Sequence, residues 1–165
     1  MLPELEVAAR HWQQVTDYLV ALARAVEPSC WGEPSPYPDW SNKDLLAHLA
    51  AGYAVRRSYL EHLVARNDLG PRIDIDAANA ERTAERRDTP VEALIEEMVA
   101  TRGRLLELMG QLRRENLDVE LQRSGPPPYM QRFGDFLLDF SSHDLEHAEE
   151  LRGLAREKVR LPNHS

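Results

Sequence analysis

The sequence predicts an all-α protein and, within that class, a four-helix bundle. Four long stretches carry apolar residues at steps of three and four, the spacing that gathers side chains on one face of an α-helix. No stretch of comparable length alternates apolar and polar residues as a strand does. Proline- and glycine-rich segments separate the four stretches. Four apolar-striped helices of about 20 to 25 residues are typical of a four-helix bundle.

The first predicted helix ends before Pro28. Residues 28–40 contain four prolines, so we expect an ordered or extended loop there and no helix. The apolar stripe of this helix consists of Leu5, Ala8, Trp12, Val15, Leu19, Leu22 and Val26.

The second predicted helix starts at Ser41. The Ser41 hydroxyl can cap the first turn, and Asp44 three residues later resembles a capping box with a shorter acid than the usual Glu. The helix runs to about Arg66, where the turn-forming residues of 67–71 end it. Its main stripe consists of Leu45, Leu49, Gly52, Arg56, Tyr59 and Leu63.

The third long helix follows a polar, arginine-rich segment over 72–88, in which a short helix around 77–86 is plausible. At its start, Thr89 offers a capping hydroxyl, Pro90 occupies the first helical position, and Glu92 adds an acid to the first turn. Its stripe consists of Val91, Leu94, Ile95, Met98, Arg102, Leu105, Met109 and Leu112.

The connection over 114–132 carries no long helical period and contains a strong break at residues 124–128, Ser-Gly-Pro-Pro-Pro. It is too long for a tight helical hairpin, so we expect a crossover between helices 3 and 4 that changes the helix order. The fourth predicted helix runs from about Phe133 to Lys158. Its stripe consists of Phe133, Phe136, Leu137, Phe140, His143, His147, Leu151 and Leu154.

Composition narrows the function classes. The 165 residues carry a formal charge of -8, and this length predicts a single domain over 1–165. An acidic chain is a poor general nucleic-acid binder, because the neutralisation of phosphates drives that binding. We find no signal-peptide pattern at the start and no apolar run near the ~20 residues of a membrane span. We therefore expect a soluble cytoplasmic protein that binds neither nucleic acid nor membrane.

Cys30 is the single cysteine of the sequence. One cysteine excludes an intrachain disulfide framework, a cysteine-rich zinc module and an iron–sulfur cluster. We expect Cys30 to be a reduced, partly packed structural thiol, with a catalytic thiol as the alternative.

Three of the six histidines are candidate metal ligands. His143 and His147 lie four residues apart, which places them one above the other on the inward face of the fourth helix. His48 lies on the same side of the second helix as its apolar stripe. Three imidazoles can hold zinc, nickel, iron or manganese and leave positions open for water or substrate. The alternative is a set of buried histidines that are satisfied by hydrogen bonds.

Two carboxylates stand at the right spacing to orient these imidazoles. Asp44 precedes His48 by one turn, and Asp139 precedes His143 by one turn. Each can accept an imidazole N–H and fix the tautomer, or else be a solvent-exposed helix charge. The other three histidines, His11, His62 and His164, are interpreted as surface residues.

The sequence lacks several well-known catalytic and nucleotide-binding motifs. The segment that begins at His143 is not a zincin motif, because Asp144 stands where that motif has its catalytic Glu. We find no nucleophile elbow, phosphate loop or dinucleotide fingerprint. An anionic substrate can be met by one of two arginine groups, although most of these side chains are expected on a solvated face; the groups are Arg56 and Arg57, and Arg82, Arg86 and Arg87.

Two segments resemble the DinB/YfiT-like superfamily, which includes the mycothiol maleylpyruvate isomerase N-terminal domain. Residues 40–49, Trp-Ser-Asn-Lys-Asp-Leu-Leu-Ala-His-Leu, resemble its second-helix motif. Residues 143–152 resemble its fourth-helix motif with two histidines four apart. The resemblance implies an up-down-down-up four-helix bundle with a divalent metal on His48, His143 and His147. It also implies a homodimer. The chain ends soon after the fourth predicted helix, so we do not expect the isomerase's additional C-terminal domain or its specific reaction.

The resulting leading hypothesis is a metal-dependent enzyme that transfers a low-molecular-weight thiol to a small electrophilic molecule. Zinc or nickel is the expected metal, with iron or manganese as alternatives. Because Cys30 is the only cysteine, we expect the thiol to come from a cofactor. Two other hypotheses remain: a non-catalytic metal- or ligand-binding bundle, in which Trp40, Tyr53 and Phe140 are core or pocket wall, and a metal-dependent hydrolase that uses only water.

Overall fold

The computed structural model describes residues 1–71, 75–123 and 127–155, apart from the side chains of residues 75, 76 and 140. The described residues are mostly helical, which confirms the predicted helical class. In chain order the elements are α1 (Pro3–Ala25), the 3-10 helix η1 (Pro28–Gly32), α2 (Asn42–Arg66), α3 (Ile75–Glu85), α4 (Val91–Gln111), α5 (Arg114–Leu117), β1 (Glu120–Arg123), β2 (Tyr129–Arg132), α6 (Phe133–Leu138) and α7 (Phe140–Arg152).

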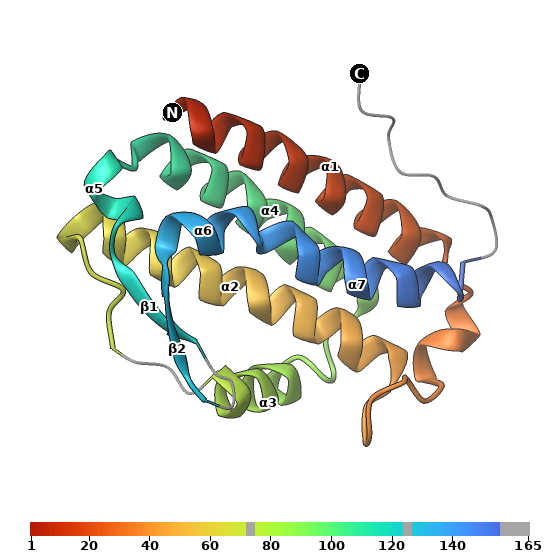
Figure 1. Ribbon diagram of the computed structural model, residues 1–165. Coiled ribbons are helices and arrows are strands. Elements are labelled where there is room, and N and C mark those ends of the chain that lie inside the picture. Colours follow the sequence, from red (N-terminus) through yellow and green to blue (C-terminus); the bar gives the residue numbers. More distant parts are fainter. Residues whose placement is uncertain (72–74, 124–126, 156–165) are drawn as a thin grey trace.

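The long helices lie side by side. α2 packs along α4 and α1 packs along α7, while α1 also contacts α4 and α2 also contacts α7. In Figure 1, α1 and the α6–α7 segment run in one direction, whereas α2 and α4 run in the opposite direction. The helix α3 packs against α2. The site described below lies between α2 and α7.

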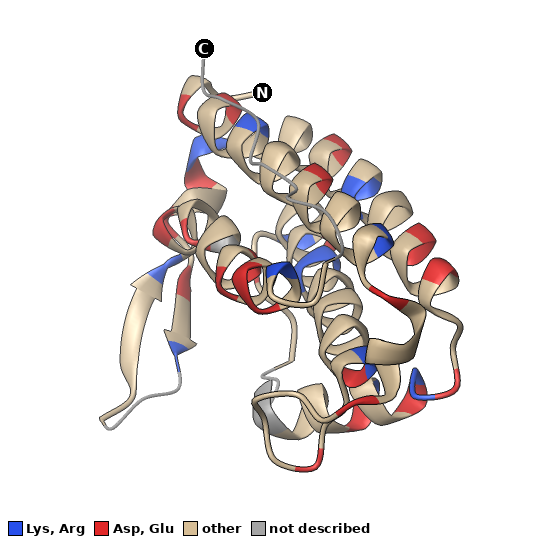
Figure 2. Ribbon diagram, turned by 90° about the vertical axis from the view of Figure 1, so that its right-hand side faces the viewer, with Lys and Arg blue, Asp and Glu red and all other residues tan. Residues whose placement is uncertain are grey.

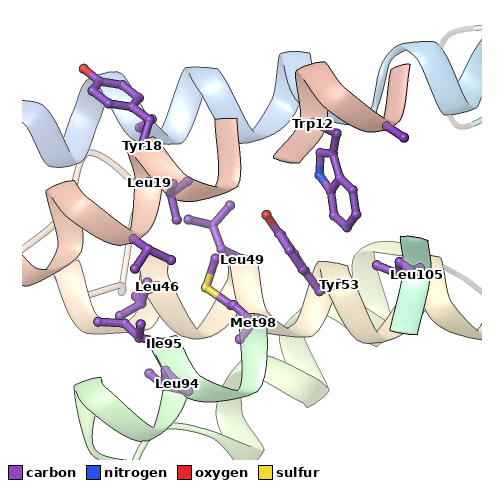
Figure 3. Packing of buried hydrophobic residues seen from close by; sticks show 14 of the residues in the cluster. Trp12, Tyr18, Leu19, Leu46, Leu49, Tyr53, Leu94, Ile95, Met98 and Leu105 are labelled. Atoms are coloured by element: carbon purple, nitrogen blue, oxygen red, sulfur yellow. The ribbon is translucent and has the colours of Figure 1, made fainter. Parts of the chain in front are cut away.

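The apolar stripes meet in one core. Figure 3 shows Leu19 of α1, Leu46 and Leu49 of α2, and Ile95 and Met98 of α4 converging between the helices. All five side chains are buried. Burial of an aliphatic side chain of this size stabilises a fold by about 1.5–3 kcal/mol relative to exposure. The predicted helix faces are therefore the faces that hold the molecule together.

The start of α2 matches the predicted capping box. The Ser41 hydroxyl accepts a hydrogen bond from the Asp44 backbone N–H, and the Asp44 carboxylate accepts one from the Ser41 backbone N–H. The Asn42 side chain donates to the Cys30 carbonyl at 2.8 Å. At the other end, Asn67 takes the left-handed conformation that commonly closes a helix. Both ends of α2 are therefore fixed locally.

The predicted start of α4 was wrong in detail. Pro90 is the N-cap residue and no side chain caps the helix, so Thr89 does not play the predicted role. The Thr89 backbone N–H instead donates to the Arg86 carbonyl, which closes the turn after α3. The proline still marks the boundary, because its ring fixes the backbone just before the first helical residue.

Two connections differ from the sequence-based expectation. Pro28–Gly32 forms a 3-10 helix where only a loop was expected. The crossover contains α5 and an antiparallel hairpin, in which Glu120 pairs with Arg132. Its two short strands do not alternate buried and exposed residues strictly, so the alternation test misses them.

The fourth helix is divided at Asp139 into α6 and α7. Backbone bonds of i→i+3 type, from Asp139 to Phe136 and from Ser142 to Asp139, tighten the chain there. The helix α7 ends at Arg152, earlier than predicted, and residues 156–158 of the predicted helix lie outside the described residues. The break falls four residues before His143, so both α7 histidines lie on one uninterrupted helix.

The outer faces of the helices carry interspersed acidic and basic residues (Figure 2). Several form solvent-exposed ion pairs, such as Arg24 with Glu92. None of the helices in the described part of the chain combines the length and the apolar character needed to cross a bilayer. Exposed pairs of this kind contribute about 0–1 kcal/mol each, so the apolar core dominates the stability.

Candidate metal centre

The structure brings His48, His143 and His147 together between α2 and α7. One nitrogen from each imidazole lies within 4.8 Å of the others. The Nε2 atoms of His48 and His143 are 3.2 Å apart although 95 positions separate the residues in sequence. His48 and His147 are buried, and the His143 side chain is 41% exposed. The cluster therefore combines two buried imidazoles with one that is partly exposed.

The observed spacing fits a shared ion. Two nitrogens that are each about 2.0–2.1 Å from a zinc ion, at tetrahedral or octahedral angles, lie roughly 3–3.4 Å from each other. The 3.2 Å between His48 and His143 falls in this range. Two unprotonated imidazole nitrogens at this distance repel each other unless a proton or a cation lies between them. The donor set thus suits a divalent metal that accepts imidazole.

Asp144 orients His143 from inside the core. Its Oδ1 lies 3.3 Å from His143 Nδ1, so a proton on that nitrogen leaves Nε2 available to a metal. The carboxylate forms a two-pronged ion pair with Arg56, at 2.7 and 2.8 Å, and accepts the Trp12 indole N–H at 3.0 Å. Asp144 is 0% exposed and Arg56 is 7% exposed. This buried charge network fixes Asp144 and thereby supports the orientation of His143.

The network keeps Asp144 ionised. Burial alone would raise the pKa of this carboxyl, but the Arg56 charge and the hydrogen bonds from His143 and Arg56 hold the pKa far below its usual range. Next to the network, Tyr53 and Thr16 share a 2.7 Å hydrogen bond between their hydroxyls. Burial and the nearby Asp144 charge raise the pKa of Tyr53, so its hydroxyl stays neutral.

Glu150 orients His147 from the rim. His147 Nδ1 lies 2.8 Å from Glu150 Oε2, which again leaves Nε2 as the nitrogen available to a metal. The other oxygen of Glu150 accepts the Tyr37 hydroxyl at 2.8 Å. Burial, followed by the Glu150 contact, raises the pKa of Tyr37 to about 12, so the hydroxyl remains a donor at neutral pH. Burial lowers the pKa of His147 and keeps this imidazole neutral, although Glu150 opposes the shift.

The loop over residues 33–41 covers the same side of the site. Its ends are joined because the Ser35 N–H donates to the Trp40 carbonyl at 2.8 Å and the Asn42 N–H donates to the Glu33 carbonyl at 2.9 Å. The Trp40 ring lies 5.1 Å from the His48 ring, centre to centre. The same loop lines an open groove of about 580 Å³. Tyr37 and Trp40 are among the residues that line this groove.

Among the described residues, no carboxylate orients His48. Its Nδ1 is buried without a hydrogen-bond partner among the described residues. Burial, together with the charges of His143 and His147, lowers the pKa of His48 to about 3. The imidazole is therefore neutral across the physiological range, which is the form that binds metals.

Neither of the carboxylates proposed from spacing orients a histidine. The Asp44 carboxylate is used by the N-cap of α2 and accepts the Arg87 side chain at 3.1 Å. Asp139 accepts the Gln131 side chain at 2.9 Å. The two predicted carboxylates lie one turn before the histidines, whereas Asp144 is adjacent to His143 and Glu150 lies three residues after His147.

The interpretation of the other histidines as surface residues was wrong for His11. Its Nδ1 lies 2.9 Å from the hydroxyl of the buried Ser141, and the ring is half-buried. His62 is also half-buried and lies 3.2 Å from the exposed Asp68 carboxylate. His164 lies outside the described residues.

Most of the arginines suggested for binding an anionic substrate already form ion pairs with carboxylates of the protein. Arg56 is buried with Asp144, contrary to a solvated face. Arg86 pairs with Glu97 at 2.7 Å, and Arg57 lies 3.7 Å from Glu61. Arg87, as noted, binds the cap of α2. Arg82 is half-buried, and one of its guanidinium nitrogens has no hydrogen-bond partner within the described part.

The other candidate residues, Trp40, Tyr53, Phe140 and Cys30, do not form one group. Trp40 lies against the site and Tyr53 is buried in the core, where its ring packs 5.2 Å from that of Trp12 (Figure 3). The Phe140 side chain lies outside the described residues. Cys30 is half-buried and packs against the core from η1.

Comparison with known proteins places the chain in a family. The model of the mycothiol maleylpyruvate isomerase N-terminal domain matches residues 12–136. Among curated proteins no sequence matches significantly. Two solved structures share the fold: a mycothiol-dependent maleylpyruvate isomerase (TM-score 0.76, 17% identity, 96% of this chain covered) and a histidine-to-alanine mutant of such an enzyme (TM-score 0.75, 19% identity, 98% covered).

The chain spans 65% of the length of each of these solved structures. At such identity the likeness establishes the arrangement of the helices, while the match to the family model extends over most of the chain. The chain therefore belongs to the mycothiol maleylpyruvate isomerase N-terminal domain family, which has the DinB-like fold.

Proposed function

We propose that the chain binds a divalent metal through His48, His143 and His147. The observation that carries the proposal is the convergence of three imidazole nitrogens within 4.8 Å, with carboxylates directing two of the rings. Nitrogen ligands of this kind suit zinc or nickel, and also iron or manganese. Buried, neutral histidines need no proton to be removed before they bind a metal.

We propose further that this metal centre serves an enzyme that transfers a low-molecular-weight thiol to a small electrophilic molecule. When bound, the metal supplies Lewis-acid chemistry, which lowers the pKa of a thiol or of water at the site. The mycothiol dependence named for the matched isomerases supports a thiol and makes mycothiol the first candidate. Because Cys30 is the only cysteine, a cofactor thiol suits the chain better than one of its own.

The residues around the proposed metal would have separate roles. Asp144 and Glu150 hold the protons on Nδ1 of His143 and His147 and keep both rings in one orientation. The Trp40 ring shields His48 from water. The half-exposed His143 marks the side from which a substrate and a thiol can approach. With most of the nearby arginines paired, the site offers few cations to an anionic substrate.

We propose that residues 1–165 form one domain with four principal helices in up-down-down-up order. The packing of α1 against α4 and α7, and of α2 against the same two helices, supports this arrangement. A homodimer, which the family resemblance suggests, and a cytoplasmic location, which was expected from the sequence, are also parts of the proposal.

The metal is tested by elemental analysis of protein purified without a histidine tag. We expect about one zinc or nickel ion per chain, and almost none in the double variant His143→Ala, His147→Ala. His62→Ala is the matched control, because His62 lies outside the cluster and should leave the metal content unchanged. Equal metal content in the double variant and the wild type would contradict the proposal.

The reaction is tested by offering the metal-loaded protein several electrophiles with and without mycothiol. Thiol-dependent turnover that disappears in the double variant supports the transferase. Turnover without any thiol indicates a metal-dependent hydrolase. No turnover with full metal occupancy indicates a binding protein.

A further inference from the structure

Glu150 joins the metal-site histidine His147 to the 33–41 loop. One carboxylate oxygen faces His147 Nδ1 at 2.8 Å, and the other accepts the Tyr37 hydroxyl at 2.8 Å. The Glu150 side chain is 25% exposed, so by itself it has room to turn toward water. The hydrogen bond from Tyr37 removes that freedom, because it holds the second oxygen while the first faces the imidazole.

We propose that Tyr37 is a positioning residue of the metal centre, which acts through Glu150 to hold the His147 imidazole in its metal-binding orientation. The inference rests on the proposed metal site. It adds a residue that lies far from His147 in sequence and outside both segments that resemble the family, residues 40–49 and 143–152.

The loop supplies Tyr37 with a support of its own. The Tyr37 ring lies 5.7 Å from the Trp40 ring, and the loop is closed at its base by backbone hydrogen bonds. The Tyr37 ring also meets the His147 ring edge-on, with centres 5.7 Å apart. Tyr37 therefore contacts His147 directly through its ring and indirectly through Glu150. Two contacts to one imidazole restrain both its position and its rotation.

The alternative is that Tyr37 only fastens the loop to α7. Both roles use the same hydrogen bond, but they predict different measurements. A fastening role affects the stability of the metal-free protein and leaves the ligand environment of a bound ion unchanged. A positioning role changes the affinity and the spectrum of the bound ion, even when the metal-free protein remains as stable as before.

The test compares Tyr37→Phe, Glu150→Gln and Tyr129→Phe with the wild type. Tyr37→Phe removes only the hydroxyl, from a residue that is 37% exposed as a whole, so the fold should survive. Tyr129 is 52% exposed on β2 and serves as the matched control for loss of a tyrosine hydroxyl. The readouts are the zinc dissociation constant from competition with a chromophoric chelator, the visible spectrum of the Co²⁺-loaded protein, and the unfolding temperature without metal.

Loss of a hydrogen-bond partner of a metal ligand typically weakens metal binding by about 10–100-fold. We expect Glu150→Gln to weaken zinc binding by about tenfold and Tyr37→Phe, one step farther from the ion, by about threefold. Tyr37→Phe should also shift the Co²⁺ absorption bands, whereas Tyr129→Phe should match the wild type throughout.

Each failure has its own pattern. If the wild type binds neither Zn²⁺ nor Co²⁺, the proposed metal site is wrong and this inference falls with it. If the wild type binds both ions and Tyr37→Phe has the same affinity and spectrum, the metal site stands and the positioning role of Tyr37 is wrong. A lower unfolding temperature of metal-free Tyr37→Phe with an unchanged spectrum likewise assigns Tyr37 to loop attachment and overturns the inference.

Discussion

His143 and His147 lie one helical turn apart on α7, yet the molecule supports them in opposite ways. Behind His143 stands a fully buried carboxylate, Asp144, which is held by a buried arginine and an indole. Behind His147 stands Glu150, a partly exposed carboxylate that is held by a loop tyrosine. One support belongs to the core and the other to the rim. The difference teaches that similar hydrogen bonds at a site can have very different consequences for the stability of the whole fold.

The largest expected effect is at the core support. Arg56→Met leaves the Asp144 carboxylate buried without its ion-pair partner, and breaking such a pair destabilises a protein by about 3–5 kcal/mol. Urea unfolding of the metal-free protein at pH 7 measures this loss.

The double variant Arg56→Met, Asp144→Leu is the control for that substitution. It replaces both charges by apolar groups, and such replacements are often close to neutral. We therefore expect part of the stability to return, reduced by the loss of the hydrogen bonds that Asp144 accepts from Trp12 and His143. If the single and double variants are equally unstable, the loss of stability comes from lost packing around Arg56. The contrast between the buried support of His143 and the partly exposed support of His147 would then not rest on the ion pair.

The second effect depends on pH and separates the histidines from Asp144. A histidine in the unfolded chain has a pKa of about 6.5. The pKa of His48 is lowered to about 3, and that of His147 is lowered as well. Between these limits the unfolded chain binds more protons than the folded one, so the stability of the metal-free protein falls as the pH drops below about 6.5.

Asp144 acts in a lower pH range. Its lowered pKa contributes stability that is fully present above the unfolded value of about 3.9 and is lost as the pH falls through the folded-state pKa. Unfolding free energies measured in chelator between pH 7 and pH 4.5 therefore report the histidines. We expect His48→Gln to flatten the pH dependence in this window; an unchanged slope would mean that burial does not suppress protonation of His48.

The smallest expected effect is at the rim. Glu150→Gln should change the stability of the metal-free protein by less than about 1 kcal/mol, because pairs with partly exposed partners contribute little. The same urea unfolding experiment used for Arg56→Met gives a direct contrast. A loss as large as that of the core variant would show that the rim support is part of the folding core.

The long helices could be predicted because their signal is local and repeated. The stripe of α2 runs from Leu45 to Leu63, and the helix is capped at Ser41. Both features can be predicted from the spacing of residues within this one helix. The β1–β2 hairpin could not be predicted in this way, since strands of four residues give the period too little length. The helical class could therefore be predicted from the sequence, whereas the hairpin in the crossover could not.

The three histidines could be singled out because two of them share a helix face and the third lies on an apolar stripe. Their supports were harder to find. The partners Arg56 and Asp144 lie 88 positions apart, and no local pattern joins them. One signal was available: Arg56 stands on the apolar stripe of α2, and a charged residue there implies a buried partner. Glu150 was also within reach, since it follows His147 by three residues and shares its helix face.

The cap of α2 has a consequence for motion. Helix ends are where local unfolding usually begins, because the first four N–H groups have no partner within the helix. Here Ser41 and Asp44 satisfy each other, Arg87 reaches the same carboxylate, and the Asn42 side chain ties the first turn to Cys30. His48 follows only one turn later. The helix end that carries this histidine is thus protected from fraying, so the geometry of the site persists through the small openings that most helix ends undergo.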